Sequence, residues 1–188
     1  EPPGGDPLRA RGPHAADAPG PDSSLYWAFF ASNRRSATID PATPEGRSQL
    51  ELLAGRADII LDCGVLAREG IDADALLRAK PSLVVVRVTS FGQDGPWADY
   101  LAPDLVAAAL GGFAATTGDI DTPPLKGFGE LNFITSGTYA AIGALIALYH
   151  ARETGEGQIV DCSVHEAIAS VLEHVFMWWW YSPRLGPI

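Results

Sequence analysis

The chain has 188 residues, 47% of them hydrophobic, with a formal net charge of −10. This length supports one domain with a sizeable core and does not by itself argue for two. Nucleic-acid binding needs a basic stripe to meet phosphates, and the sequence has no run rich in Lys and Arg. We therefore expect no nucleic-acid partner.

The two cysteines, Cys63 and Cys162, are far apart in the sequence. They are too few for a disulfide framework and lack metal-ligand spacing, so we expect a reducing, cytoplasmic location. His165 and Glu166 are adjacent, and His174 follows nine residues after His165, a pattern that suits no metal site. We expect no metal and no bound cofactor.

The first 24 residues are rich in Pro, Gly, Asp and Ala, which predicts an irregular surface segment. They are polar and turn-rich, so we expect no signal peptide here. Residues 36–40 alternate in the manner of a short strand. Both ends of the chain look like cuts through a larger protein, as if another strand preceded Glu1.

Helices and strands are then expected to alternate. A helix at 43–56 has Thr43 as its N-cap and Pro44 in its first turn. Strands are expected at 58–62 and 83–89, with a helix at 72–79 between them. This order predicts a doubly wound α/β sheet. Such sheets bind ligands beyond the carboxyl ends of their strands, where the glycine loop 90–96 lies. From its residues alone, this loop is a structural turn or a ligand loop.

The second half of the chain changes in character, because 103–118 and 134–151 are rich in Ala and Gly. Residues 133–149 carry no charge and approach the shortest membrane-spanning length. We favour a fully buried helix of a soluble domain and expect no membrane partner. A strand at 158–163 and an amphipathic helix from about 164 follow. The tryptophans at 178–180 need a cover, which we expect from the rest of the same polypeptide.

Several stretches, met in order from Glu1 to about Ile168, resemble the CoA-transferases of family III, which include formyl-CoA and carnitine CoA-transferases and share their fold with α-methylacyl-CoA racemases. They read EPPGGDPLR, SNRRSATIDPATPEGR, SFGQDGPWADY, GDIDTPPLKGF and GTYAAIGALIALYHARETGEGQIVDCSVHEA. The resemblance implies a Rossmann-like large domain, here lacking its first strand and the small second domain. It also implies an interlocked dimer and CoA as a substrate or ligand. Residues 1–188 would then be one partial large domain.

In the transferases that this chain resembles, an aspartate attacks an acyl-CoA thioester and forms covalent intermediates. That aspartate stands four residues before the glycine that opens the small-residue helix. The glycine here is Gly137, so the matching residue is Phe133, which has no nucleophilic group. Asn132 and Glu130 are weak substitutes: the first is an amide, and the second lies three residues upstream. The catalytic residue is therefore unknown.

The resemblance also points to residues that hold CoA. Arg68 matches an arginine that contacts CoA, while Asp62 and Cys63 stand where a CoA-gripping loop begins, shortened here by about three residues. Gly92 and Gly95 belong to the loop expected to line the pocket.

Other family positions are changed as well. Pro2 and Ala42 replace polar or basic residues, and Pro103 replaces the racemase histidine, so racemase chemistry is not expected.

Three functions remain open from the sequence. The chain could be a CoA-transferase that has recruited Glu130. It could be a non-catalytic half of a fused or heteromeric transferase, moving CoA between an acyl-CoA and a carboxylate only with a partner chain. It could also be an acyl-CoA-binding module without transferase activity. We favour the second, since the packing motifs are intact while the nucleophile is missing.

Overall fold

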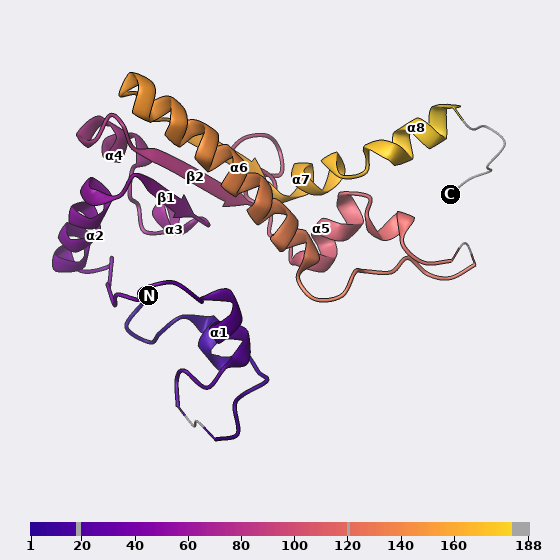
Figure 1. Ribbon diagram of the computed structural model, residues 1–188, viewed down its shortest axis with the longest axis horizontal. Coiled ribbons are helices and arrows are strands. Elements are labelled where there is room, and N and C mark those ends of the chain that lie inside the picture. The colour runs from indigo at the N-terminus through magenta and orange to yellow at the C-terminus, as the bar shows by residue number, and fades with distance from the viewer. Residues whose placement is uncertain (18–19, 120, 182–188) are drawn as a thin grey trace. The chain divides into compact units, whose positions relative to one another are not determined.

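The computed structural model describes residues 1–17, 20–119 and 121–181 (Figure 1). It forms two compact units, Glu1–Ala54 and Gly55–Ile188, which are considered separately. The elements in chain order are η1 (Pro7–Ala10), α1 (Leu25–Phe30), α2 (Pro44–Arg56), β1 (Ile59–Asp62), α3 (Val65–Arg68), α4 (Ala73–Ala79), β2 (Val84–Thr89), α5 (Asp104–Leu110), η2 (Ala114–Thr116), α6 (Leu131–Thr154), β3 (Ile159–Ser163), α7 (Val164–Ser170) and α8 (Glu173–Tyr181).

The first unit is held mainly by polar contacts. Ser24 begins α1, because its Oγ accepts a hydrogen bond from the N–H of Trp27 (3.0 Å) and donates to the carbonyl of Leu8 (3.2 Å). Arg9 forms an ion pair with Glu1 at 2.6 Å. The expected strand at 36–40 is wrong: one backbone bond, from the N–H of Ile39 to Glu1, does not make a ladder.

The predicted start of α2 is confirmed. The N–H of Gly46 donates to Oγ1 of Thr43 at 3.0 Å, so Thr43 caps the helix and Pro44 is its first residue. Only glycine fits at residue 46, because the backbone of Asp40 lies against it and an added Cβ would stand 1.8 Å from the Asp40 carbonyl oxygen.

The second unit contains a three-stranded parallel sheet in the order β1-β2-β3. Ile59 is level with Val84, and Val85 is level with Ile159. The three strands and α4 begin and end within a residue of the predicted ranges, so the α/β class with parallel strands is confirmed, while α6 extends three residues beyond the predicted 134–151 at each end. The carboxyl ends of all three strands meet at one edge, which positions the site described below.

Helix α6 packs along the sheet over β2 (Figure 1). Val84 and Val86 are fully buried there. The helix meets them with a row of small side chains on one face, at Ala140, Ala144, Ala147 and Ala151. Gly143 adds to the close approach, because a Cβ there would stand 3.0 Å from Cγ1 of Val160.

The opposite face of α6 is exposed, so the expectation of a fully buried helix is wrong. Its exposed large apolar residues include Tyr139, Ile142, Leu145, Ile146 and Tyr149. Among the described residues, α6 is the one helix whose length and composition would allow it to cross a membrane, and 28% of its most apolar stretch is buried. The alanine face on the sheet is typical of a core helix of a globular domain.

The Ala/Gly-rich region 103–118 contains two short helices, α5 and η2. Helix α5 ends at its C-cap Gly111, where a Cβ would lie 2.6 Å from Cγ2 of Ile168 on α7. The helix predicted from about 164 is confirmed at its start and divides into α7 and α8. Trp178 and Trp180 on α8 are exposed, and the side chain of Trp179 lies outside the described residues, as does the segment 182–188.

Candidate functional site

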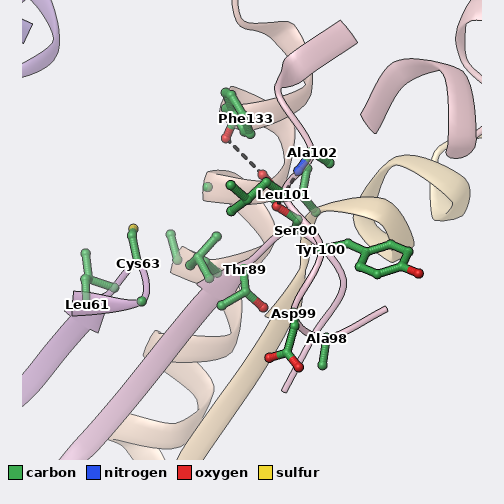
Figure 2. A pocket seen from close by; sticks show the side chains of 17 residues that line it. Leu61, Cys63, Thr89, Ser90, Ala98, Asp99, Tyr100, Leu101, Ala102 and Phe133 are labelled. Atoms are coloured by element: carbon green, nitrogen blue, oxygen red, sulfur yellow. Dashed lines mark hydrogen bonds between the residues drawn. The ribbon is translucent and has the colours of Figure 1, made fainter. Parts of the chain in front are cut away.

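A cavity of about 660 Å³ opens where β1 and β2 end, beside the first turns of α6 (Figure 2). Its walls come from four places: the ends of the two strands, the segment after the glycine loop, α6 and the start of α7. The lining residues are Leu61, Cys63, Gly64, Val88, Thr89, Ser90, Ala98, Asp99, Tyr100, Leu101, Ala102, Phe133, Ser136, Gly137, Ala140, Ala141 and Val164. This is the edge at which α/β sheets bind ligands.

The segment 98–102 is attached to the end of β2. The N–H of Ala102 donates to Oγ of Ser90 at 3.2 Å, and the carbonyl of Ser90 accepts from the N–H of His165 at 3.1 Å. Ser90 therefore joins this segment to the start of α7. In Figure 2, Asp99 and Tyr100 lie on the segment that Ser90 attaches, and Leu61 and Cys63 lie at the end of β1, on the opposite side of the cavity.

The wall contributed by α6 presents an aromatic ring. Phe133 is the third residue of the helix, lines the cavity and is 41% exposed. One turn on, Ser136 is buried, and its Oγ donates to the carbonyls of Asn132 (3.0 Å) and Phe133 (3.1 Å). Gly137 also lines the cavity, and a Cβ there would meet nothing within 4 Å.

A buried carboxylate, Asp104, holds the start of α6. Its Oδ1 accepts from the N–H of Asn132 (3.1 Å) and of Phe133 (3.3 Å), and its Oδ2 accepts from the side-chain amide of Asn132 (2.8 Å). Lys126 Nζ forms an ion pair with the same Oδ2 at 2.8 Å. Because the first N–H groups of a helix lack partners within it, Asp104 acts as their cap from another helix.

The protonation state of Asp104 follows from these contacts. Burial acts to raise the pKa of this carboxyl, which is 5% exposed, while the hydrogen bonds from Lys126, Asn132 and the N–H of Phe133 act to lower it. The hydrogen bonds prevail, so the pKa of Asp104 lies below its ordinary value. The carboxyl group is an anion at neutral pH, and both of its oxygens already accept hydrogen bonds from these neighbours.

The two weak substitutes for a nucleophile do not reach the cavity wall. Asn132 is buried and turned to Asp104, and its Oδ1 has no hydrogen-bond partner within the described part of the chain. Glu130 stands at the N-cap of α6 without a side-chain capping bond. Neither is among the residues that line the cavity, whereas Phe133 is.

Of the residues expected to hold CoA, Cys63 lines the cavity. Burial raises the pKa of its thiol, and the Asp62 carboxylate raises it further, so the sulfur is mainly a thiol near neutral pH. Asp62 is buried, and its Oδ1 caps α3 by accepting from the N–H of Val65 (2.7 Å) and Leu66 (3.0 Å).

Arg68 is the last residue of α3, one short helix away from the cavity wall. Its side chain is 70% exposed and forms an ion pair with Glu69 at 2.9 Å. It does not line the cavity, and its role in CoA binding stays a prediction.

Gly92 and Gly95 shape the glycine loop and do not line the cavity. Both have left-handed backbone angles, with φ of 87° and 85°. The N–H of Gln93 donates to Oδ2 of Asp161 at 2.9 Å, which holds the loop over β3, and a Cβ at Gly92 would press on that carboxylate. The structure thus brings Cys63 and Phe133 to one cavity and leaves Asp62, Arg68 and both glycines outside it.

Sequence reasoning missed three residues of this region: Asp104, Lys126 and Asp99. Asp104 and Lys126 meet only because the fold brings the two segments together, and nothing local marks that pairing. Asp99 carries the one carboxylate among the described residues that line the cavity. Its position three residues after the glycine loop 90–96, which itself follows a buried strand, was the available signal.

Comparison with known proteins identifies the family of this chain. The model of CoA-transferase family III matches residues 1–186. The chain is 36% identical over 177 residues to a succinyl-CoA–D-citramalate CoA-transferase of Chloroflexus aurantiacus, covering 92% of this chain and 43% of that protein. It is 35% identical over 182 residues to the BbsE subunit of a succinyl-CoA:(R)-benzylsuccinate CoA-transferase of Thauera aromatica, covering 95% and 44%.

The chain belongs to CoA-transferase family III. The crystal structure of a CAIB/BAIF family protein from Brucella suis matches it with a TM-score of 0.86 at 31% identity, over 98% of this chain and 50% of that one. The chain thus spans less than half the length of the two curated relatives above and half of the solved structure.

Proposed function

We propose that this chain is part of a CoA-transferase, in which it supplies an acyl-CoA-binding wall and no nucleophile of its own. The attacking aspartate would come from another part of the polypeptide or from a partner chain. The assembled enzyme would move CoA from an acyl-CoA to a carboxylate. Family membership and the position of the cavity support this reading.

The observation that carries the proposal is the side chain at residue 133. The resemblance to the transferases assigns this position to the aspartate, and the cavity contains position 133 in its wall. Phe133 presents a ring there, which has no lone pair to attack a thioester. In this proposal the cavity wall contacts the substrate, and residue 133 contributes no group that can react with it.

Two nearby carboxylates, Asp104 and Glu130, do not reach the cavity in the geometry seen here. Asp104 is within 3.3 Å of the N–H of Phe133, yet it is buried, paired with Lys126 and bonded to Asn132. Its lone pairs are committed, and it does not line the cavity. Glu130 does not line the cavity either. Asp99 does, so it is the acid in this chain that the experiment must examine.

The proposed chemistry needs one aspartate and the two substrates. The carboxylate attacks the thioester carbonyl, the C–S bond breaks, and the electron pair leaves with CoA as a thiolate, which gives a mixed anhydride. The thiolate then attacks the enzyme's acyl carbon and releases the first acid as a carboxylate. The resulting aspartyl-CoA thioester passes CoA to the acceptor by the same two steps in reverse order.

A relative gives precedent for a shared enzyme of this kind, because BbsE of Thauera aromatica is named as a subunit of its transferase. We propose a comparable assembly here, with a second family III chain or domain as the partner. A cytoplasmic location remains part of the proposal, since acyl-CoA substrates are intracellular and both cysteines are free thiols.

The test is a trapping experiment on the full-length gene product with its partner. The protein is incubated with an acyl-CoA and then with hydroxylamine, which converts an activated carboxyl into a hydroxamate. Peptide mapping locates the modified residue. We expect a modified aspartate outside residues 1–188, or in the partner chain.

Modification of Asp99 or Glu130 would overturn the proposal and make this chain catalytic in itself. If CoA binds while no residue is modified and no transfer occurs, the chain is an acyl-CoA-binding module without transferase activity.

A further inference from the structure

We infer that the cavity accepts an uncharged, apolar acyl group and discriminates against acyl groups with a second carboxylate, such as succinyl. This inference rests on the proposed function, because it assumes that the cavity receives an acyl-CoA. It adds the substrate class, which neither the family nor the relatives assign to this chain.

The first argument is the charge of the lining. Among the 17 described residues that form the wall, none is Lys, Arg or His, and the single charged side chain is the acid Asp99. A free carboxylate entering the cavity would find no cation to pair with and would be repelled by Asp99. Removing a carboxylate from water without a partner is strongly unfavourable.

The second argument is that three polar groups of the wall already have partners within the chain. Ser136 Oγ donates to two carbonyls of its own helix, and Ser90 Oγ accepts from the N–H of Ala102. Thr89 Oγ1 accepts from the side-chain amide of Gln93 at 3.3 Å. The Ser136 hydroxyl proton is therefore already used within α6, whereas Ser90 and Thr89 act as acceptors in these bonds and keep only a neutral O–H each, with no positive charge, to offer a carboxylate.

The third argument is the surface that remains. Leu61, Leu101 and Phe133 are exposed side chains at the cavity, and Val88 and Val164 line it from β2 and α7. Their apolar area would be removed from water by an apolar ligand, which is favourable. The volume of about 660 Å³ falls in the usual range for ligand pockets.

The experiment compares three ligands on the full-length protein by isothermal titration calorimetry. They are free CoA, succinyl-CoA and 4-methylpentanoyl-CoA. The last is an uncharged counterpart of succinyl-CoA, because an isopropyl group replaces the terminal carboxylate with similar shape. We expect 4-methylpentanoyl-CoA to bind about tenfold or more tightly than succinyl-CoA.

The results separate the two proposals. If CoA binds and succinyl-CoA binds as tightly as the isostere or more so, the inference is wrong while the proposed function stands. If none of the three ligands binds, the proposed function fails and the inference fails with it.

A variant that adds a positive charge to the wall tests the cause. Leu101 lines the cavity and is 91% exposed, so Leu101→Arg supplies the missing cation without disturbing the core. We expect the ratio of the two dissociation constants to shift toward succinyl-CoA by about tenfold. The matched control is Leu105→Arg, on an exposed leucine of α5 outside the lining, which should leave the ratio unchanged. An equal shift in both variants would contradict the assignment.

A filling variant gives a second readout. Ala141 lines the cavity and its side chain is exposed, so Ala141→Trp would occupy the space an acyl tail needs. Binding of 4-methylpentanoyl-CoA should weaken by about tenfold relative to free CoA. Ile142→Trp, on the neighbouring exposed residue outside the lining, is the control. Unchanged binding in Ala141→Trp would place the acyl group elsewhere.

Discussion

Asp104 holds the first turn of α6, the part of the helix that carries Phe133 into the cavity wall. One buried carboxylate caps two N–H groups of α6, holds the Asn132 amide and pairs with Lys126. We expect Asp104→Asn to lower the free energy of unfolding of the full-length protein by about 1.5–3 kcal/mol at neutral pH, the usual contribution of hydrogen bonds to a charged group. Urea denaturation measures this difference. Asp99→Asn, on an exposed carboxylate, should leave the midpoint unchanged.

The same carboxyl predicts a pH dependence. Its pKa is lowered in the folded state, so its contribution to stability is complete above the unfolded value of about 3.9 and is lost as the pH falls through the folded pKa. The stability difference between wild type and Asp104→Asn should therefore be constant from pH 7 to about pH 5 and shrink in more acid solution. A difference that grows in acid would contradict the ion pair.

Phe133 permits a gain-of-function test of the missing nucleophile. Residue 133 lies in the first turn of α6, where the helix dipole favours a negative charge, so Phe133→Asp is expected to fold. With acyl-CoA and hydroxylamine, the variant should give a hydroxamate at residue 133 that wild type lacks. Phe133→Asn is the control of similar size. A folded variant that binds CoA and gives no adduct would show that the thioester does not reach this wall.

Arg68 tests the prediction about the CoA contacts. Because its side chain is 70% exposed and solvent screens its charge, we expect Arg68→Ala to weaken CoA binding by about 1 kcal/mol, or about fivefold, the upper end for an exposed ion pair. Arg78→Ala is the matched control, since the Arg78 side chain is 69% exposed and pairs with Asp72, the N-cap of α4. Calorimetry in low salt measures both. Equal affinities for the two variants would remove Arg68 from the binding site.

At the scale of elements, glycines on the helices have opposite roles. A Cβ at Gly111 would stand 2.6 Å from Ile168 and 2.9 Å from the carbonyl of Ala107, so Gly111→Ala should destabilise the fold by about 1–3 kcal/mol through overpacking. A Cβ at Gly137 would meet nothing, so Gly137→Ala should stabilise α6 by about 0.5–1 kcal/mol. Thermal denaturation of both variants checks the signs, and the same sign for both would contradict the packing of α5 on α7.

At the scale of the whole molecule, the two compact units have unequal cores. In the described part of Glu1–Ala54 the buried residues are Ser24, Gly46 and Ala54, whereas β2 in the second unit has three valines with no exposure. Local opening follows the amount of buried apolar contact. Hydrogen–deuterium exchange should therefore be slowest at 84–88 and distinctly faster at 25–30. Equal protection of both segments would contradict this difference.

The parts of the fold that could be predicted from the sequence are those with local signals. Thr43 and Pro44 mark the start of α2, and the valine run marks β2, and both are confirmed. The packing of Gly111 on Ile168 could not be predicted, because the two residues lie 57 positions apart by number (168 − 111) and meet only in the folded chain. The exposed face of α6 also escaped prediction, since its composition is apolar all round.

The same distinction between local signals and long-range contacts applies to the residues of the candidate site. Matching of motifs put Phe133 and Cys63 at the site, and both line one cavity. The bonds of Asp104 to Lys126 and Asn132 are long-range, with a separation of 28 residues to Asn132, and no periodicity announces them. Function at this site therefore depends on contacts that exist only once the chain is folded.

The alanine row on α6 has a mechanical consequence. An alanine side chain is a single methyl group with no alternative rotamers and projects little from the helix. The helix α6 therefore has a smooth surface against the valines of β2, formed by Ala140, Ala144, Ala147 and Ala151. Interlocking leucines would resist sliding along the helix axis, and a smooth surface resists it less. The axial position of α6, and with it the depth at which Phe133 stands in the cavity, is then set largely at the end where Asp104 holds the first turn.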